Sequence, residues 1–467
     1  MSNSSQLKKS LEALRDQPDQ LIEIILRQAG VIEEQQKKIQ ELEAKINDLN
    51  DKNNRLSSRI DDLEKTAARQ AAPFRIKDSK RVTQPKTPGR KSGHKGSCRS
   101  IPDLVDEEIV VPLENCPQCG KSVGQRRQII QYIEEIPPVR PKIIKLVTQE
   151  ASCAHCCKDV RSTHPLQVSL AEGAAGVQMG PNVLGIATEL NKKHGLTMRK
   201  TCAVLRQLFN FKVSPGGLSQ ALNRIAKKLK PEYENLLARL RDGPYVHSDE
   251  TSWWVNGPGY WLWVFATKQA TVYRVAEGRG RNIVLETLGN DYAGTLISDC
   301  LSIYDDVNSR QQKCYSHHLK AISNAMEEVP SDYFVQLKRL LKSAMLLKGA
   351  GLAPDKCAEY RANLQQTAEE LLSTPRQGLE EKVRKRLFKQ KDHLFTFLDY
   401  PEVDATNNLA ERQLRPAVIA RKVSSGNKTE KGANTWQILA SLAATCAQQG
   451  KSFAELVSQA APLNYAR

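Results

Sequence analysis

The sequence contains no long hydrophobic run: nowhere do about 18 apolar residues follow one another, as a membrane-spanning helix requires. The first residues, MSNSSQLKKSLEALRDQPD, also lack the apolar core of a secretory signal peptide. These two absences argue against an integral membrane protein and against secretion through a cleaved leader. We therefore expect a cytoplasmic protein, associated with the nucleoid if its partner is DNA.

The sequence also lacks the cysteine pattern of a disulfide framework, and its acidic residues are too few to balance its basic residues. The 11 cysteines are odd in number and mostly isolated, whereas secreted disulfide-rich domains use even sets, so we expect reduced thiols. Only 52 Asp and Glu oppose 69 Lys and Arg, which gives a net charge of +17 and an isoelectric point near 9.3. This balance indicates a polyanionic partner, either nucleic acid or an anionic membrane surface. The 467 residues are enough for several domains with a sizeable core.

Residues 21–65 carry two apolar rows that repeat every seven residues, as in a coiled coil. One row is mainly isoleucine and the other is leucine, a combination that favours a parallel two-stranded coil, and Asn53 within the isoleucine row would fix the register. An amphipathic helix packed on its own domain is the alternative, which four consistent heptads disfavour. We predict a parallel homodimer. The rows are Ile32, Ile39, Ile46 and Ile60, and Leu42, Leu49, Leu56 and Leu63.

Residues 67–105 interrupt the helical pattern and are strongly basic. From residue 67 to residue 100 there are ten Lys or Arg and one Asp, a net charge of +9, whereas residues 1–66 have eleven basic and thirteen acidic residues, a net charge of −2. Because the segment is also rich in Pro, Gly and Ser, we expect a flexible or extended linker. Its charge suits contacts with DNA phosphates, and a merely solvated linker is the alternative. The predicted contacts are Arg81, Lys86, Arg90, Lys91 and Lys95.

Two Cys-x₂-Cys pairs within residues 106–165 predict a structural zinc site. Cys116 and Cys119 form the first pair, and Cys153 and Cys156 form the second. Four thiolates suit tetrahedral Zn²⁺, and a site with all four positions filled is structural, not catalytic. Between the pairs, IIQYIEEI and PKIIKLVTQ alternate like the strands of a long hairpin with a PPVRP turn, which would bring the cysteines together.

Residues 166–241 have a helical pattern with breaks near Gly195, Ser214 and Gly216. Two of these helices carry Lys and Arg and are joined by a short turn. A helix-turn-helix DNA-binding domain is one interpretation. An ordinary helical bundle is the other, and the pattern favours neither.

Residues 242–318 alternate as strands, with a hairpin turn at NGPG, residues 256–259. Residues 319–400 are almost wholly helical by pattern and separate two strand-rich parts of one core. We expect the tryptophans of the hairpin to pack on the faces of a sheet, with base stacking as the alternative. They are Trp253, Trp254, Trp261 and Trp263.

Three acidic residues are the candidates for chemistry. Asp249 and Asp299 each end a short apolar run that predicts a buried strand, and Glu411 follows the cap pair Asn407 and Asn408 in the first turn of a predicted helix. Each acid alone could be a solvated carboxylate, or one that complements a helix dipole. Together they offer the hard oxygen ligands that Mg²⁺ or Mn²⁺ prefers. Two such ions about 4 Å apart clamp the attacking and leaving oxygens of a phosphodiester.

A basic flank follows the third acid, and we predict that Arg412 and Arg415 contact DNA. Cys314 and His317 have the spacing of metal ligands, but no second pair accompanies them, so a packing role is expected for both.

The strings HSDET, ISDCLSIYD and NNLAERQLRP, in this order, resemble the catalytic signatures of bacterial DDE transposases of the insertion-sequence 66 family. The resemblance covers almost the whole chain, including GRKSGHKG and the four-cysteine module. It implies that Asp249, Asp299 and Glu411 form the catalytic triad of a ribonuclease-H-like core, a mixed sheet flanked by helices. It also implies metal-dependent cleavage at element ends, transfer of the 3′-hydroxyl strand into target DNA, and accessory proteins encoded beside this one.

The predicted protein is therefore a multidomain α+β DNA transposase. A non-enzymatic, zinc-containing DNA-binding regulator is the alternative, and a nuclease that cuts without joining is a third class. The predicted parts are a coiled-coil helix (1–66), a basic linker (67–105), a zinc module (106–165), a helical domain (166–241), the first part of the core (242–318), a helical insertion (319–400), the last part of the core (401–450) and a C-terminal helix or tail (451–467).

Overall fold

The computed structural model describes residues 18–70, 93, 99–351 and 353–463. The chain divides into two compact units, Met1–Ile133 and Glu134–Arg467. Among the helices in the described ranges, none combines the length and the apolar character needed to cross a membrane.

The first unit contains the predicted long helix as α2 (Pro18–Gln70). Its two apolar rows are exposed: Ile32, Ile39, Leu42, Ile46 and Leu49 each leave 49–63% of their surface accessible. A row of large apolar side chains in water is unfavourable, and a second helix with the same rows would cover it. The helix is thus confirmed, and the paired coil stays a prediction.

The long hairpin expected between the cysteine pairs is not formed, so that prediction is wrong. Within the described residues 99–149 there is no strand, and the apolar side chains of Ile129, Ile133 and Ile143 are exposed. The alternation gives these segments a propensity to form strands, but no core surface is present to bury their apolar side chains. The prolines at 137, 138 and 141 also remove backbone hydrogen-bond donors. A short hairpin follows instead, formed by β1 (Glu150–Ser152) and β2 (Asp159–Arg161).

A five-stranded mixed sheet organises the second unit, with the strand order β5-β4-β3-β6-β7. β3 (Tyr245–Trp253), β4 (Tyr260–Ala266) and β5 (Thr271–Glu277) are antiparallel and include the predicted NGPG hairpin. β6 (Thr295–Ser298) pairs parallel with β3 on one side and with β7 (Arg310–Lys313) on the other. This mixed order is consistent with the expected ribonuclease-H-like core.

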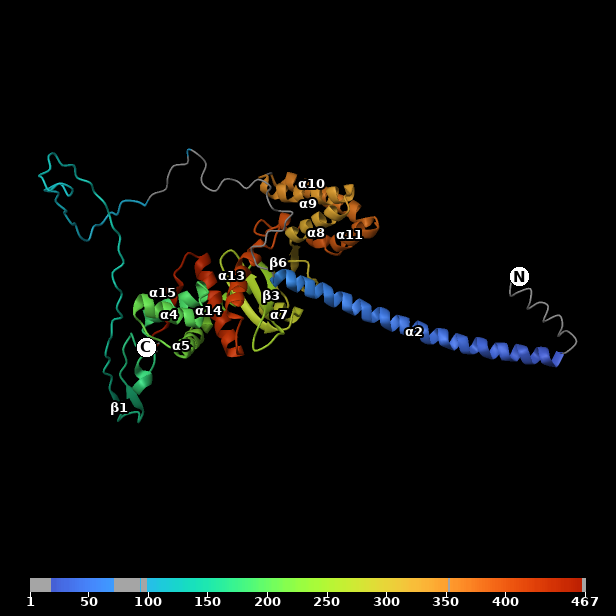
Figure 1. Ribbon diagram of the computed structural model, residues 1–467, viewed down its shortest axis with the longest axis horizontal. Helices are drawn as coiled ribbons and strands as arrows, with labels where there is room; N and C mark the ends of the chain where they lie inside the picture. The colour runs from blue at the N-terminus through green and yellow to red at the C-terminus, as the bar shows by residue number, and fades with distance from the viewer. Residues whose placement is uncertain (1–17, 71–92, 94–98, 352, 464–467) are drawn as a thin grey trace. The chain divides into compact units, whose positions relative to one another are not determined.

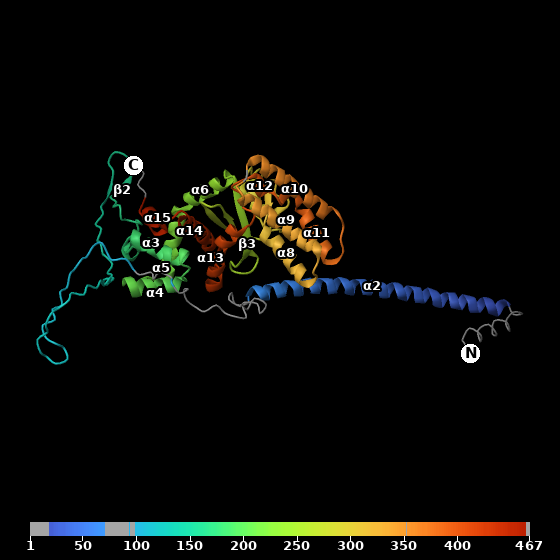
Figure 2. The ribbon, with the colours of Figure 1, turned by 90° about the horizontal axis from the view of Figure 1, so that it is seen from above.

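Helices cover both faces of this sheet (Figures 1 and 2). One core cluster joins Val246, Trp263 and Leu296 of the sheet to helices on one face, and a second joins Leu262 and Val264 to helices on the other face. The first face packs against α5 (Pro215–Lys228), α6 (Lys230–Arg241) and α7 (Arg281–Leu288). The second packs against α13 (Asn408–Ser424), and α14 (Glu430–Gln448) contributes to both clusters.

The segment between β7 and α13 is helical, as predicted for residues 319–400, and forms its own core cluster (Figure 1). Tyr245 of β3 and Ile297 of β6 belong to this cluster, so the helices are anchored on the sheet. The helices are α8 (Tyr315–Glu328), α9 (Asp332–Gly349), α10 (Pro354–Ser373), α11 (Gly378–Lys389) and α12 (Thr396–Asp399).

The remaining elements are short helices, most of which precede β3. Gly195 has φ +69° and separates two helices as predicted, whereas Gly216 lies inside the first turn of α5, so the break expected there is absent. The remaining elements are η2 (Gly173–Gly176), α3 (Pro181–Thr188), the π-helix η3 (Glu189–Lys193), α4 (Met198–Phe209), η4 (Ser302–Tyr304), η5 (Lys391–His393) and α15 (Phe453–Ala460).

We expect the full chain to sediment as a dimer, and the double change Leu42→Glu with Leu49→Glu to make it a monomer. Two carboxylates facing each other in the seam would lose their water on pairing, which costs far more than the apolar contact gains. Analytical ultracentrifugation measures the mass. Lys37→Glu with Ala44→Glu places two acids on the outer face of the same helix and leaves the dimer intact. A wild-type monomer at tens of micromolar concentration would contradict the prediction.

Candidate active site

Two of the three predicted acids come together through strand pairing. Asp249 is the fifth of nine residues of β3, so it lies within the strand and not at its end, which corrects the sequence-based prediction. Asp299 directly follows β6. The parallel register places His247 opposite Ile297, so two residues further on Asp249 and Asp299 lie at the same level of the sheet.

The third acid is delivered by the N-terminus of α13, which is fixed to β3 by Asn407. The side-chain amide of Asn407 donates to the carbonyl of Ser248 at 2.7 Å, and its oxygen lies 3.2 Å from Nδ1 of His247. The sequence suggested that the side chain of Asn407 caps the helix, but it makes no capping hydrogen bond. Instead, it joins the helix to the strand. Glu411 is one turn further along the helix, and its charge makes a small contribution to the raised pKa of Asp249.

The three acids interact electrostatically. The pKa of Asp249 is raised to about 7, mainly by burial and also by the charges of Glu250 and Asp299, with a smaller contribution from Glu411. Among the described residues, no Lys or Arg forms an ion pair with Asp249, Asp299 or Glu411. Mutual repulsion between buried carboxylates is relieved when a divalent cation binds them. Among the described residues, however, the group whose ligand atoms lie within 4.8 Å of one another is Cys314, His317 and Glu411, and it contains neither aspartate.

Backbone amides hold the two aspartates in place. The N–H of Glu250 donates to Oδ1 of Asp249 at 2.9 Å, and the N–H of Leu301 donates to Oδ1 of Asp299 at 2.9 Å. One oxygen of each carboxylate is thus oriented by the chain. Oxygen donors from two strands and one helix fit a hard cation such as Mg²⁺.

The neighbouring acids have structural roles. Glu250 points to the opposite face of β3, where its carboxylate pairs with Arg279 at 2.5 Å and accepts a hydrogen bond from Tyr304 at 2.5 Å. Asp305 forms ion pairs with Lys313 at 3.2 Å and Lys389 at 2.7 Å. Both carboxylates are therefore neutralised by cations of the chain.

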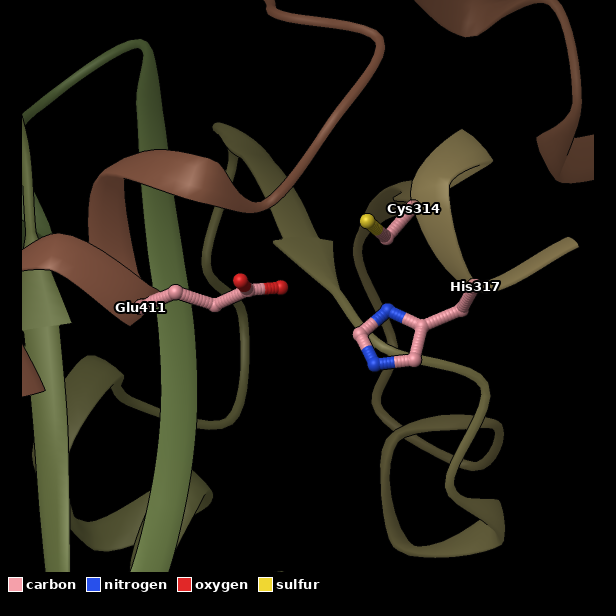
Figure 3. A group of neighbouring side chains, drawn as sticks. All are labelled: Cys314, His317 and Glu411. Carbon is pink, nitrogen blue, oxygen red and sulfur yellow. The ribbon is translucent and has the colours of Figure 1, made fainter. Parts of the chain in front are cut away.

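Cys314 and His317 lie beside Glu411 (Figure 3). The packing role expected from the sequence therefore does not fully describe these two side chains. The imidazole of His317 and the carboxylate of Glu411 point toward one another, and the ligand atoms of all three residues lie within 4.8 Å of one another. The thiol of Cys314 accepts a hydrogen bond from the backbone N–H of Asn407 at 3.1 Å. The hydrogen bond with Cys314 raises the pKa of His317, and Asp299 and Glu411 raise it further.

In the sequence, only the spacing of Cys314 and His317 indicated that these two residues could lie near the acids. Nothing in the sequence indicated the contacts of Asn407 with His247 and Ser248, because these partners are about 160 residues away along the chain.

The predicted DNA contacts fall into two groups. Arg412 and Arg415 are exposed on α13, one and four residues after Glu411. The basic-linker residues lie outside the described part of the chain; they are Arg81, Lys86, Arg90, Lys91 and Lys95.

The two cysteine pairs adopt the same backbone turn, one in each compact unit. The N–H of Cys116 donates to the carbonyl of Lys121 at 2.7 Å, and the N–H of Cys153 donates to the carbonyl of Lys158 at 2.9 Å. The residue after the second cysteine is left-handed in both, with φ +73° at Gly120 and +53° at Cys157. Backbone hydrogen bonds lower the pKa of Cys116 and of Cys153, which favours the thiolates that a metal requires.

Comparison with known proteins assigns the chain to a family. The family model described as "Transposase IS66 family" matches residues 176–435, more than half of the chain. The chain belongs to the IS66 transposase family. The resemblance drawn from the acidic strings is thereby confirmed, and the matched region of this IS66-family transposase includes Asp249, Asp299 and Glu411.

A relative from Sinorhizobium fredii (strain NBRC 101917 / NGR234), described as "Uncharacterized protein y4qI", is 22% identical over 422 residues. The match covers 80% of this chain and 74% of that protein.

In metal-free protein, we expect Asp249→Asn to raise the free energy of unfolding by about 2–4 kcal/mol at about pH 8. The unfolded carboxyl ionises near 3.8 and the folded one near 7, so the native state loses stability as the pH rises between these values. The gain should vanish below about pH 4, where both states are protonated. Chemical denaturation at both pH values measures it.

Added Mg²⁺ should stabilise the wild type and leave Asp249→Asn nearly unchanged, because the variant loses a ligand. Asp306→Asn, which changes an exposed acid nearby, is the control and should resemble the wild type. Equal stability of wild type and Asp249→Asn at about pH 8 would contradict the assignment.

Proposed function

We propose that this IS66-family protein cleaves DNA at the ends of a mobile element and joins the freed 3′-hydroxyl strand to target DNA. Asp249, Asp299 and Glu411 would hold the divalent metal that this chemistry requires. The observation that supports the proposal is the electrostatic interaction of Asp249 with Asp299 and Glu411, none of which forms an ion pair with a Lys or Arg among the described residues.

The donor set fits Mg²⁺ or Mn²⁺. All three ligands are carboxylates, and Glu411 is exposed, so water and a substrate phosphate have access to the remaining coordination positions. When bound, a pair of such ions neutralises the charge that develops on the attacking and leaving oxygens of an in-line displacement.

The chain's own contribution is positioning. The backbone amides of Glu250 and Leu301 orient the aspartates, and Asn407 sets the distance between Glu411 and the sheet. Arg412 and Arg415 are exposed beside Glu411, where they would contact the phosphates of a strand that crosses the site. No protein nucleophile is required, because water and a DNA hydroxyl are the attacking groups.

We expect Asp249→Asn, Asp299→Asn and Glu411→Gln each to lower strand transfer by more than about 100-fold, since loss of even an outer-shell partner of a metal ligand costs 10- to 100-fold. The assay uses linear DNA that carries the ends of the encoding element, with Mg²⁺. Binding of the same ends in a gel-shift assay should be nearly unchanged, and Asp306→Asn should transfer strands like the wild type.

The competing functions give different results in this assay. A DNA-binding regulator would show no transfer in the wild type, and a nuclease would release cut ends without joined products. Retained transfer in any one of the three acid variants would refute the assignment of that residue.

The cysteine pairs support a second part of the proposal, a structural zinc ion held by Cys116, Cys119, Cys153 and Cys156. Each pair has a preformed turn and a thiol with a lowered pKa, so two pairs would complete a tetrahedral site. Together with the α2 coil and the basic linker, this module would bind DNA ends as a homodimer. Accessory proteins of the same element would act with it.

We expect freshly purified protein to contain about one zinc per chain, and Cys116→Ser or Cys153→Ser to lose it, because a hydroxyl binds zinc far more weakly than a thiolate. Elemental analysis measures the metal. Cys157→Ser changes the cysteine directly after the second pair and should keep the zinc. A zinc-free wild type, or full zinc in both ligand variants, would exclude the site.

A further inference from the structure

An aromatic hollow of about 560 Å³ lies at the C-terminal end of β3, the strand that carries Asp249. It is formed by the β3–β4 hairpin and the C-terminal end of α13, and its lining includes Trp254, Tyr260, Trp261 and Arg421. Trp254 exposes 48% of its surface, so the expectation that the hairpin tryptophans all pack on sheet faces is wrong for this residue. Trp253 and Trp263 are buried, as expected.

The walls of this hollow are fixed before any ligand arrives. The loop after α13 joins the hairpin through the N–H of Asn427, which donates to the carbonyl of Trp254 at 2.8 Å, and through the indole N–H of Trp253, which donates to the Asn427 side chain at 2.9 Å. Gly426 has φ +87°, and a Cβ there would lie 2.4 Å from the Trp254 carbonyl, so only glycine allows this approach. Arg421 donates to Oγ of Ser252 at 2.7 Å.

The chemistry of the hollow matches a planar ring attached to an anion. Trp254 offers an exposed indole face, and Arg421 adds a guanidinium to the lining of the same hollow. Aromatic and guanidinium planes are the surfaces on which unstacked bases bind, and the cationic group suits the adjoining phosphate. A purely apolar ligand would gain nothing from a guanidinium next to the aromatic face.

The hollow is also connected to the acids. Trp253 follows Asp249 by four residues, which is about 13 Å along a strand. A DNA strand whose phosphate lies at the acids would place a base only a few nucleotides away in the hollow.

We propose that this hollow binds an unstacked DNA base close to the position of cleavage. The occupant is one nucleobase of a frayed or single-stranded end, stacked on Trp254 and held beside the guanidinium of Arg421. Removing a base from the duplex frees the neighbouring backbone, so the phosphate reaches the acids of β3 and α13. This inference rests on the proposed function, because it names the form of DNA that the site accepts.

The test compares two duplexes that differ only in a short single-stranded overhang. One overhang carries thymidine, and the other carries abasic residues with the same phosphates and no bases. Binding is measured by fluorescence anisotropy with the full-length protein and Ca²⁺, which supports binding without strand transfer. We expect the wild type to prefer the thymidine overhang by about five-fold or more, the value of one stacked base.

Trp254→Ala should abolish this preference and leave the affinity for the abasic duplex unchanged, and Trp254→Phe should restore part of it. Tyr360→Ala removes an exposed aromatic side chain from α10 and should keep the full preference. Equal binding of the two duplexes by the wild type, or an undiminished preference in Trp254→Ala, would overturn the inference.

The failure of this inference and that of the proposed function are distinguishable. Asp249→Asn should retain the base preference while losing strand transfer. A wild type that shows the preference but never transfers strands would refute the proposed chemistry and keep the base site. A wild type that transfers strands without the base preference would refute the base site and keep the proposed chemistry.

Discussion

The buried hydrogen bonds of Asn407 are the interaction on which the candidate active site depends. Its amide bridges the backbone of β3 to the start of α13, and its own N–H reaches the thiol of Cys314 at the start of α8. Three segments far apart in the sequence therefore meet at one side chain. Without that amide, the side-chain hydrogen bond between the start of α13 and the backbone of β3 would be lost, at a cost of about 1 kcal/mol.

The alternation of β3 assigns two adjacent acids to different roles. Glu250 faces the core, where Arg279 and Tyr304 satisfy its carboxylate. Asp249 lies on the other face, where burial and the charges of neighbouring acids raise its pKa. The apolar clusters on both faces of the sheet provide the stability that keeps such repulsive groups together. A site of this kind is destabilised when empty and stabilised by a cation, which links metal binding to the stability of the fold.

The helical segment between β7 and α13 is part of the same construction. Its core includes Tyr245 of β3 and Ile297 of β6, both close to the aspartates in sequence. The segment begins with Cys314 and His317, which lie against Glu411. An insertion of this length could have been an independent appendage, but its first turn forms one wall of the site, and the helix that carries the third acid follows its end.

The sequence by itself determined the types of the elements and the candidate acids. The heptads of residues 21–65, the alternation around Trp263 and the helical pattern of 319–400 are local signals, because side-chain burial repeats with the period of each element. The three acids followed from strings of a few residues each. The tertiary structure alone decided that Asn407 joins helix to strand, that Trp254 is exposed, and that residues 129–149 form no hairpin. Those outcomes depend on which surfaces meet across distances of 100 residues or more along the chain, and local periodicity carries no information about such contacts.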